Sequence, residues 1–311
     1  MSEILKKTRE ICQLLEIKPA RSKGQNFLIN EKIYDEIVKV AEIHEDDVVL
    51  EVGPGLGFLT ARLAEKASQV IAVELDDKIA TYLNMAIAAQ DVENIFIVNE
   101  DVLKFNLGAF FEKNDFEARQ KYKIVANLPY NISSVFLRTF LSSQLKPESI
   151  TLMLQKEVAN RIIAQSPDNN LLALSVAFYA ESKIIREVKA GNFWPEPRVD
   201  SAVIKIDLNK NDHWRDFLIS NNIIKSGTKK DDLVLEQEIL NLEKKFFRML
   251  KISFSAKRKM IKNNLLAGLE IKALDLEKKL VSTGIDVKVR AEDLSLDDFK
   301  KLFAAIYKFM I

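Results

Sequence analysis

The strongest constraint on the fold is an alternation of short apolar runs with helix-compatible stretches between residues 45 and 207. The apolar runs are Val48–Val52, Val70–Val73, Ile95–Val98, Ile124–Ala126, Leu152–Leu154 and Ala202–Ile206. The helix-compatible stretches include Leu59–Lys66, Asp76–Ala89 and Ile132–Leu145. Short continuous apolar strands that alternate with helices are typical of a parallel sheet covered on both faces. The sequence therefore predicts an α/β fold.

The chain changes character after this region. Residues 209–235 are polar and mixed in charge, and from residue 236 onward apolar residues recur only at helical spacing. We therefore expect an α/β domain over residues 1–208, a polar linker or insertion over 209–235, and an all-helical C-terminal domain over 236–311. Within the first part, Phe193-Trp194-Pro195-Glu196-Pro197 is expected to be a loop, because two prolines at that spacing cannot lie in a regular strand ladder.

Charge is balanced overall but clustered locally. The 46 basic and 45 acidic residues give a net charge of +1, which by itself indicates no partner. Residues 251–262 nevertheless hold five cations and no acid, and a second basic cluster near the N-terminus contains Arg21 and Lys23. Such clusters are compatible with a polyanionic partner, and a solvated helix face is the alternative interpretation.

We expect the end of the first basic stretch to be a helix that turns its apolar side chains to the core and its cations outward. The apolar side chains are Met260, Ile261 and Leu265. The cations available to phosphate are Lys257, Arg258, Lys259 and Lys262.

Several classes of protein are disfavoured by composition. The single cysteine, Cys12, excludes an internal disulfide framework and a multi-cysteine metal site, and the two histidines lie far apart in polar surroundings. No run of eighteen apolar residues occurs, and the first ten residues carry charges of both signs without an apolar core. We expect a cytoplasmic protein without a metal or a membrane span.

A glycine-rich turn, Glu51-Val52-Gly53-Pro54-Gly55-Leu56-Gly57, follows the first apolar strand and precedes a helix. Glycines let such a turn approach a ligand closely, but the spacing differs from that of dinucleotide-binding folds, so NAD is not favoured. Glu74 ends the next strand, where an acid can accept hydrogen bonds from ribose hydroxyls. A purely structural turn and a surface acid are the alternative interpretations.

Asp101 follows the third strand and would lie over the same crevice. There its carboxylate could accept a hydrogen bond from the amino group of an adenine. A helix N-cap is an equally simple role for an aspartate at this position.

The segment Asn127-Leu128-Pro129-Tyr130 follows the fourth strand. The N6 amino group of adenine is a poor nucleophile because its lone pair is delocalised into the ring. The Asn127 side-chain oxygen and a nearby backbone carbonyl could hold that amino group so that the lone pair points at a methyl donor, and Pro129 would fix the carbonyl before it. Tyr130 offers a flat face for an extruded base, and a plain turn is the alternative.

Ordered matches along the chain resemble one family. They are Lys23–Leu28, Glu51–Thr60, Glu74, Asp101, Asn127–Tyr130, Phe193–Pro197 and Val199–Val203. Residues 20–207 thereby resemble the ribosomal RNA adenine N6-dimethyltransferases, and the stretches Phe254–Lys259 and Asn263–Leu265 resemble the C-terminal domain of that family. Glu100, where many members carry glycine, and the long polar stretch 209–235 depart from the family pattern.

The resemblance implies a Rossmann-like class I methyltransferase with a seven-stranded sheet and S-adenosyl-L-methionine as cofactor. The expected cofactor contacts are Asn26, Leu28, Gly53, Gly55, Glu74, Asp101 and Asn127. Asn127, Leu128, Pro129 and Tyr130 would present the target adenine, and Phe193 would close over its other face.

The Gly24-Gln25-Asn26-Phe27-Leu28 pattern is similar to that of the housekeeping branch of the family. Members of that branch modify two adjacent adenines near the 3′ end of 16S ribosomal RNA in the small subunit. We therefore expect a monomeric enzyme with this RNA as its partner.

Three other functions remain open from the sequence. The first is a resistance-type dimethyltransferase that acts on large-subunit RNA. The second is a non-catalytic RNA-binding factor on the same fold, which the intact Glu74, Asp101 and Asn127–Tyr130 argue against. The third, a DNA or protein methyltransferase with an Asn-Pro-Pro-Tyr motif, is disfavoured by Leu128.

Overall fold

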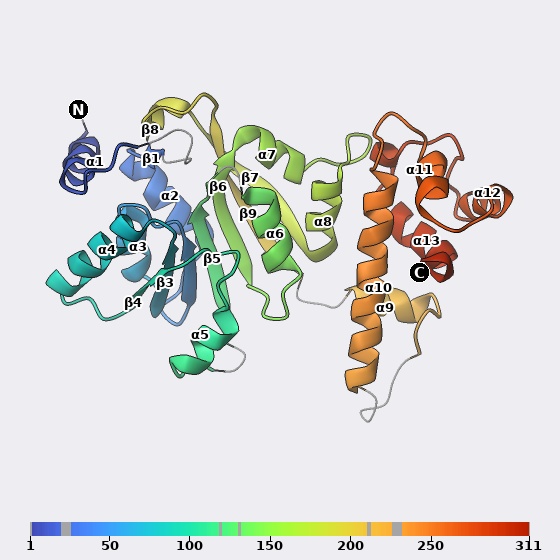
Figure 1. The fold of residues 1–311 in the computed structure, drawn as a ribbon, viewed down its shortest axis with the longest axis horizontal. Helices are drawn as coiled ribbons and strands as arrows, with labels where there is room; N and C mark the ends of the chain where they lie inside the picture. The colour runs from blue at the N-terminus through green and yellow to red at the C-terminus, as the bar shows by residue number, and fades with distance from the viewer. Residues whose placement is uncertain are drawn as a thin grey trace. The chain divides into compact units, whose positions relative to one another are not determined.

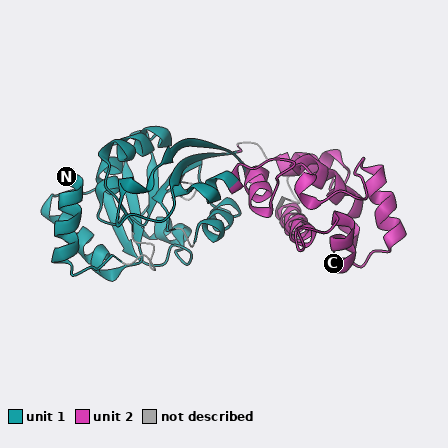
Figure 2. Cartoon of the chain, turned by 90° about the horizontal axis from the view of Figure 1, so that it is seen from above, with its two compact units in different colours: residues 1–160, 180–208 teal, residues 161–179, 209–311 magenta. Residues whose placement is uncertain are grey.

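The computed structural model describes residues 2–19, 26–117, 120–129, 132–209, 213–225 and 232–310. The chain forms two compact units, coloured separately in Figure 2. Unit 1 comprises residues 1–160 and 180–208, and unit 2 comprises residues 161–179 and 209–311. The unit boundary therefore differs from the expected division at residue 208, because residues 161–179 group with the helical part of the chain.

Unit 1 is built on a seven-stranded sheet with the order β4-β3-β2-β5-β6-β9-β7 (Figure 1). The strands are β2 (Val48–Val52), β3 (Gln69–Glu74), β4 (Ile95–Asn99), β5 (Tyr122–Asn127), β6 (Ser149–Gln155), β7 (Ala180–Val188) and β9 (Ser201–Leu208). The first five in the spatial order are parallel, which confirms the expected α/β sheet, whereas β9 and β7 are antiparallel to their neighbours.

The chain begins with a helix, and most other helices of this part of the chain lie between strands in the sequence. They are α1 (Glu3–Leu14), α2 (Glu31–Ala41), α3 (Phe58–Ala64), α4 (Asp77–Ala89), α5 (Leu107–Lys113), α6 (Ser133–Leu141) and α7 (Lys156–Ile162), with a short 3-10 helix, η2 (Ala190–Asn192). Side-chain caps fix where several helices begin. The Asp76 carboxylate accepts from the N–H groups of Lys78 and Ile79 at the start of α4, and Asn30 caps α2 in the same way.

The strand order reverses direction between β2 and β5. The chain runs outward from β2 to β3 and β4, and in the opposite direction from β5 to β6. Because parallel crossovers are right-handed, this reversal puts α3 and α4 on one face of the sheet and α5 and α6 on the other. Ligands of open α/β sheets bind at the carboxyl ends of the strands beside such a reversal.

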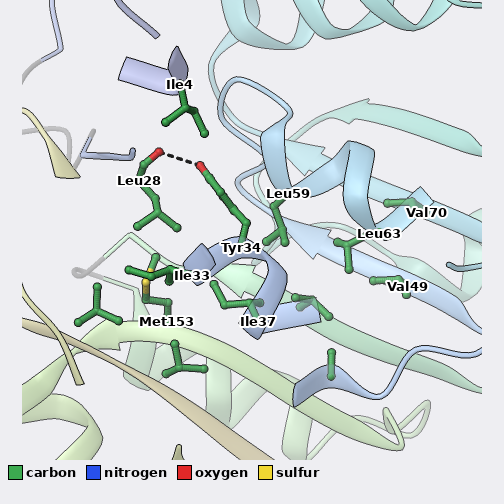
Figure 3. Close-up of a cluster of buried hydrophobic side chains, with 14 of the residues drawn as sticks. Ile4, Leu28, Ile33, Tyr34, Ile37, Val49, Leu59, Leu63, Val70 and Met153 are labelled. Carbon is green, nitrogen blue, oxygen red and sulfur yellow. Dashed lines mark hydrogen bonds between the residues drawn. The ribbon is translucent and has the colours of Figure 1, made fainter. Parts of the chain in front are cut away.

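An apolar core fixes α2 and α3 against the sheet. Figure 3 shows Ile37 of α2 and Leu63 of α3 beside Val49 of β2 and Met153 of β6, all of which are buried. The Tyr34 hydroxyl, on the same helix as Ile37, donates a hydrogen bond of 3.0 Å to the carbonyl of Leu28. This bond anchors the segment that enters the core from the N-terminal side.

A second, two-stranded sheet corrects one expectation. β1 (Phe27–Leu28) pairs antiparallel with β8 (Phe193–Trp194), so residues 193–194 are not a loop. The pairing needs only two residues and ends before Pro195, so neither proline has to supply a ladder hydrogen bond. The positions of the two prolines alone could not predict the short pairing of β1 with β8.

Unit 2 is helical, as expected for the C-terminal region. Its elements are α8 (Leu171–Tyr179), α9 (His213–Ser220), α10 (Asp232–Ser253), α11 (Ile261–Gly268), α12 (Ala273–Ser282), η3 (Ala291–Asp293), α13 (Leu296–Ile306) and η4 (Tyr307–Phe309). Within the described ranges, no helix is both long and apolar enough to cross a membrane.

An aromatic cluster joins these helices. Phe178 of α8 stacks on Phe246 of α10 with ring centroids 5.2 Å apart, and Trp214 of α9 lies 5.4 Å from Phe303 of α13. Trp214 is buried, so the expectation of a polar linker over residues 209–235 is wrong for α9, which belongs to the core of unit 2. The polar composition misled because α9 buries only Trp214 and Leu218.

Candidate cofactor-binding site

A cavity of about 470 Å³ lies where β2, β3 and β5 end. Its size is within the range of small-molecule sites in proteins. The register explains its position, because Val52, Val73 and Ala126 are aligned across the three strands and the residues that follow them emerge together. The predicted site residues that line it are Asn26, Leu28, Gly53, Gly55, Glu74, Asn127, Leu128 and Pro129.

The glycine-rich turn forms one wall of the cavity. Gly53 has a φ of +65°, and its N–H donates to the carbonyl of Val73 at 3.0 Å. A Cβ at this position would lie 3.9 Å from the Cδ of Pro129, so the turn passes close to the Asn127–Pro129 segment. Gly57 has a φ of +83°, and a Cβ there would lie only 2.7 Å from a methyl group of Leu83. Both positions therefore favour glycine.

Glu74 forms the second wall. Its side chain is buried, with Oε2 accepting from the Gly55 N–H at 3.3 Å and Oε1 from the Asp76 N–H at 2.9 Å. Burial raises the pKa of Glu74 above its ordinary value, and these two backbone donors oppose the rise. Backbone donors therefore hold both oxygens of this acid, and its side chain lines the cavity.

The Asn127 segment forms the third wall. Asn127 ends β5, and the N–H of Leu128 donates to the carbonyl of Met153 at 3.0 Å. That bond fixes the backbone next to Pro129. Tyr130 lies outside the described residues, so its predicted stacking role stays a prediction.

Asp101 and Phe193 are not among the residues that line the cavity. The Asp101 Oδ1 accepts from the Leu103 N–H at 3.0 Å within a turn, so Asp101 is not the helix N-cap that was the alternative interpretation. Phe193 is 3% exposed and packs in the apolar core. The strand pairing of Phe193 with Leu28 explains why its ring is turned away from solvent.

The cavity is also lined by residues that the sequence did not predict as site residues, among them Tyr34, Glu51 and Leu75. Leu75 is 70% exposed although it directly follows the apolar strand β3. The sequence could have indicated Leu75 as a site residue, because it is an apolar residue that directly follows the acid at the end of β3. Glu51 lies inside an apolar strand, where a buried acid is itself unusual.

The basic segment of unit 2 differs from the expected helix. Lys257, Arg258 and Lys259 lie in an exposed turn between α10 and α11, and only Lys262 is helical. Lys262 pairs with Glu277 of α12 at 2.8 Å. Ile261 and Leu265 are buried as expected, but Met260 is 40% exposed and does not face the core. Arg21 and Lys23 lie outside the described residues.

No group of three or more histidine, cysteine, aspartate or glutamate side chains could hold a metal ion within the part of the chain that the structure describes. The lining is instead glycine backbone, three acids, two amides, one tyrosine and apolar side chains. Such a lining fits a cofactor that carries a ribose, an apolar ring face and positive charge.

The sheet order and the cavity at its reversal define a class I methyltransferase fold. A dimethyladenosine transferase from Plasmodium falciparum has this fold, with a TM-score of 0.67 at 24% identity over 92% of this chain and 98% of that one. The 23S rRNA methyltransferase ErmE shares it too, with a TM-score of 0.64 at 22% identity over 91% of this chain and 100% of that one.

Sequence comparison gives the family. The family described as ribosomal RNA adenine dimethylase matches residues 18–226. A ribosomal RNA small subunit methyltransferase A from Dehalococcoides mccartyi is 36% identical over 96% of this chain and 92% of its own length. Its counterpart from Clostridium acetobutylicum is 34% identical over 97% and 98%. The chain belongs to the ribosomal RNA adenine dimethylase family, which confirms the resemblance seen in the sequence.

Proposed function

We propose that this protein transfers methyl groups from S-adenosyl-L-methionine to N6 of two adjacent adenines near the 3′ end of 16S ribosomal RNA, giving N6,N6-dimethyladenosine. The observation that carries the proposal is the meeting of Glu74, the glycine turn and Asn127 around one cavity. The small-subunit relatives, similar over nearly the whole chain, favour small-subunit RNA as the substrate.

The cofactor-binding half of the cavity comprises Glu74 and the glycine turn. Glu74 would accept hydrogen bonds from the ribose hydroxyls, while Gly53 and Gly55 let the backbone come close to the ligand. Asn26 and Leu28 line the same cavity and would complete this half. Asp101 stays a proposed partner of the cofactor's adenine, since it follows β4 at the same edge of the sheet. One of its oxygens, Oδ1, already accepts a hydrogen bond from the Leu103 N–H.

The reacting half comprises the Asn127 segment. The cofactor supplies an electrophilic methyl group when it is bound. The Asn127 side chain would accept from the target amino group, and the fixed backbone of Leu128 and Pro129 would supply a second acceptor. Such positioned acceptors favour a nitrogen whose lone pair points at the methyl group, so catalysis rests on positioning and preorganised polar groups.

The target adenine must leave its base stack to reach this cavity. Tyr130 would stack on the extruded base, and the exposed Lys257, Arg258 and Lys259 would contact phosphates of the surrounding RNA. A cationic turn is well suited to this task because its side chains are free of the core.

The test is a methyl-transfer assay on unmethylated small ribosomal subunits, with dimethyladenosine read out by mass spectrometry. We expect two dimethylated adenines near the 3′ end of the small-subunit RNA. Large subunits serve as the control substrate. Labelling of large-subunit RNA instead would reassign the protein to the resistance-type branch of the family, and methylation of neither would refute the proposal.

A further inference from the structure

Glu51 stands apart from the other buried charges of unit 1. It is 1% exposed at the end of β2 and lines the cavity, and among the described residues its Oε2 has no hydrogen-bond partner. By contrast, the ammonium of Lys123 lies 2.7 Å from Asp47, and that of Lys205 lies 2.7 Å from Glu42. A buried carboxylate is stable only when it is paired, so an ionised Glu51 would lack what these other charges have.

Among the residues that the structure describes, no cation forms an ion pair with Glu51. The groups that face it are Tyr34 of α2, Thr60 of α3 and the carboxylate of Glu74 on β3. The guanidinium of Arg62, which lies over the Tyr34 ring at 5.2 Å, is engaged by Asp35 at 2.8 Å. Glu51 therefore faces hydroxyl groups and a second acid.

Burial without a charged partner favours the protonated form of Glu51. Burial raises the pKa of Glu51 to about 8, the Glu74 carboxylate adds to the rise, and the Thr60 side chain opposes it. The geometry explains the direction of the pKa shift by itself, because the described groups that face Glu51 present oxygen atoms and carry no positive charge. A cationic ligand would supply this partner.

We infer that Glu51 keeps its proton in the cofactor-free cavity and releases it to solvent when a cationic cofactor binds, and so selects for a positively charged ligand. The step is the loss of H⁺ from the carboxylic acid, which leaves a carboxylate paired with a cation of the ligand. The inference rests on the proposed function, because S-adenosyl-L-methionine carries a sulfonium and an ammonium group. It adds that binding is coupled to proton release and that Glu51 determines cofactor specificity.

Isothermal titration calorimetry tests the coupling directly. The heat of S-adenosyl-L-methionine binding at pH 7, measured in buffers of low and high ionisation enthalpy, gives the number of protons released. We expect the wild type to release about one proton more than Glu51→Gln, which keeps the shape of the side chain but cannot ionise. The variant should also bind the cofactor more weakly.

The matched control ligand is 5′-methylthioadenosine, which has the nucleoside and the sulfur atom but neither cation. Its binding should release the same number of protons from the wild type and from Glu51→Gln, and their affinities for it should be similar. Any release that this ligand does cause reports on Glu74, which faces the nucleoside in the proposed function. The comparison therefore separates the two acids of the cavity.

Equal proton release by the wild type and Glu51→Gln on S-adenosyl-L-methionine binding would overturn the inference and leave the proposed function intact. Absence of any binding by the wild type would instead refute the proposed function. If Glu51→Gln does not fold, the pH dependence of cofactor binding by the wild type tests the inference. Its Kd for S-adenosyl-L-methionine should rise about tenfold from pH 7 to pH 6, and a Kd as flat as that for 5′-methylthioadenosine would overturn the inference.

Discussion

The backbone N–H of Gly55 donates a hydrogen bond to the Glu74 carboxylate across 3.3 Å, which ties the turn after β2 to the end of β3. The glycine-rich turn and Glu74, which the sequence analysis treated separately, are therefore joined by a hydrogen bond. Loss of the Glu74 carboxylate would remove the proposed contact with the ribose and would also leave the Gly55 N–H without this acceptor.

Glu74→Ala should weaken S-adenosyl-L-methionine binding by about 1–3 kcal/mol, because charge-assisted hydrogen bonds to the ribose are lost. Affinity for RNA should change little. Calorimetry on the folded variant measures the effect, and Glu100→Ala, which removes an exposed acid nearby, is the control. Unchanged cofactor affinity for Glu74→Ala would show that the ribose lies elsewhere.

Asn127→Ala should lower the methyl-transfer rate on the order of 100-fold while RNA binding changes far less, because the lost acceptor acts on the reacting nitrogen. Single-turnover kinetics with saturating cofactor separate this effect from any weakening of cofactor binding. A variant whose rate is normal and whose RNA affinity is low would contradict the proposed role.

Tyr130→Phe should be mild, and Tyr130→Ala should cost about 1–3 kcal/mol of transition-state stabilisation, because the proposed contribution is stacking on the extruded base. The ratio kcat/KM for small-subunit RNA is the measurement. The opposite ranking of the two variants would assign the role to the hydroxyl group.

Lys257→Glu combined with Arg258→Glu should weaken binding to the small ribosomal subunit and flatten its salt dependence, because fewer counterions are released. Cofactor affinity should stay the same. Lys262→Gln is the matched control, since Lys262 already pairs with Glu277 and should contribute less. Equal salt slopes for the double variant and the wild type would make the cationic turn a solvated surface only.

Glu51 should make the cofactor-free protein less stable as pH rises. Its pKa is about 8 in the folded protein against an ordinary 4.5, so the folded state binds the extra proton between these values. The stabilisation is present below pH 4.5 and is lost as pH rises through 8.

Urea unfolding at pH 5 and pH 8 measures this loss. We expect Glu51→Gln to gain stability relative to the wild type over that interval, by up to a few kcal/mol, since each pKa unit corresponds to about 1.4 kcal/mol. A constant difference between the two proteins would show that Glu51 is ionised throughout.

The central strands were predictable because β2, β3, β5 and β6 are buried along nearly their whole length and read as continuous apolar runs. The edge strand β7 was missed, since its exposed positions carry charges such as Glu181 and Arg186. α9 was missed for a related reason, because a helix that buries one narrow face resembles a linker in composition.

The site was predictable where it depends on strand ends. Gly53, Glu74 and Asn127 each follow or end a parallel strand, and parallel strands bring their carboxyl ends to one edge. The environment of Phe193 could not be predicted, because it depends on strand pairing with Leu28, which is far away in the sequence. Glu51 was not singled out either, since the lack of a partner for a buried acid is visible only in three dimensions.

The return of the chain to the sheet after α8 has a consequence for dissecting the protein. Residues 161–179 belong to unit 2, yet residues 180–208 supply β7 and β9 to unit 1. A truncation at residue 208 would keep α8 but delete Phe246, on which Phe178 stacks, and would leave the apolar side chains of α8 without their partners. The two units are therefore interleaved along the polypeptide, and a single cut after residue 208 would release unit 1 only together with an α8 that has lost its packing partner on α10.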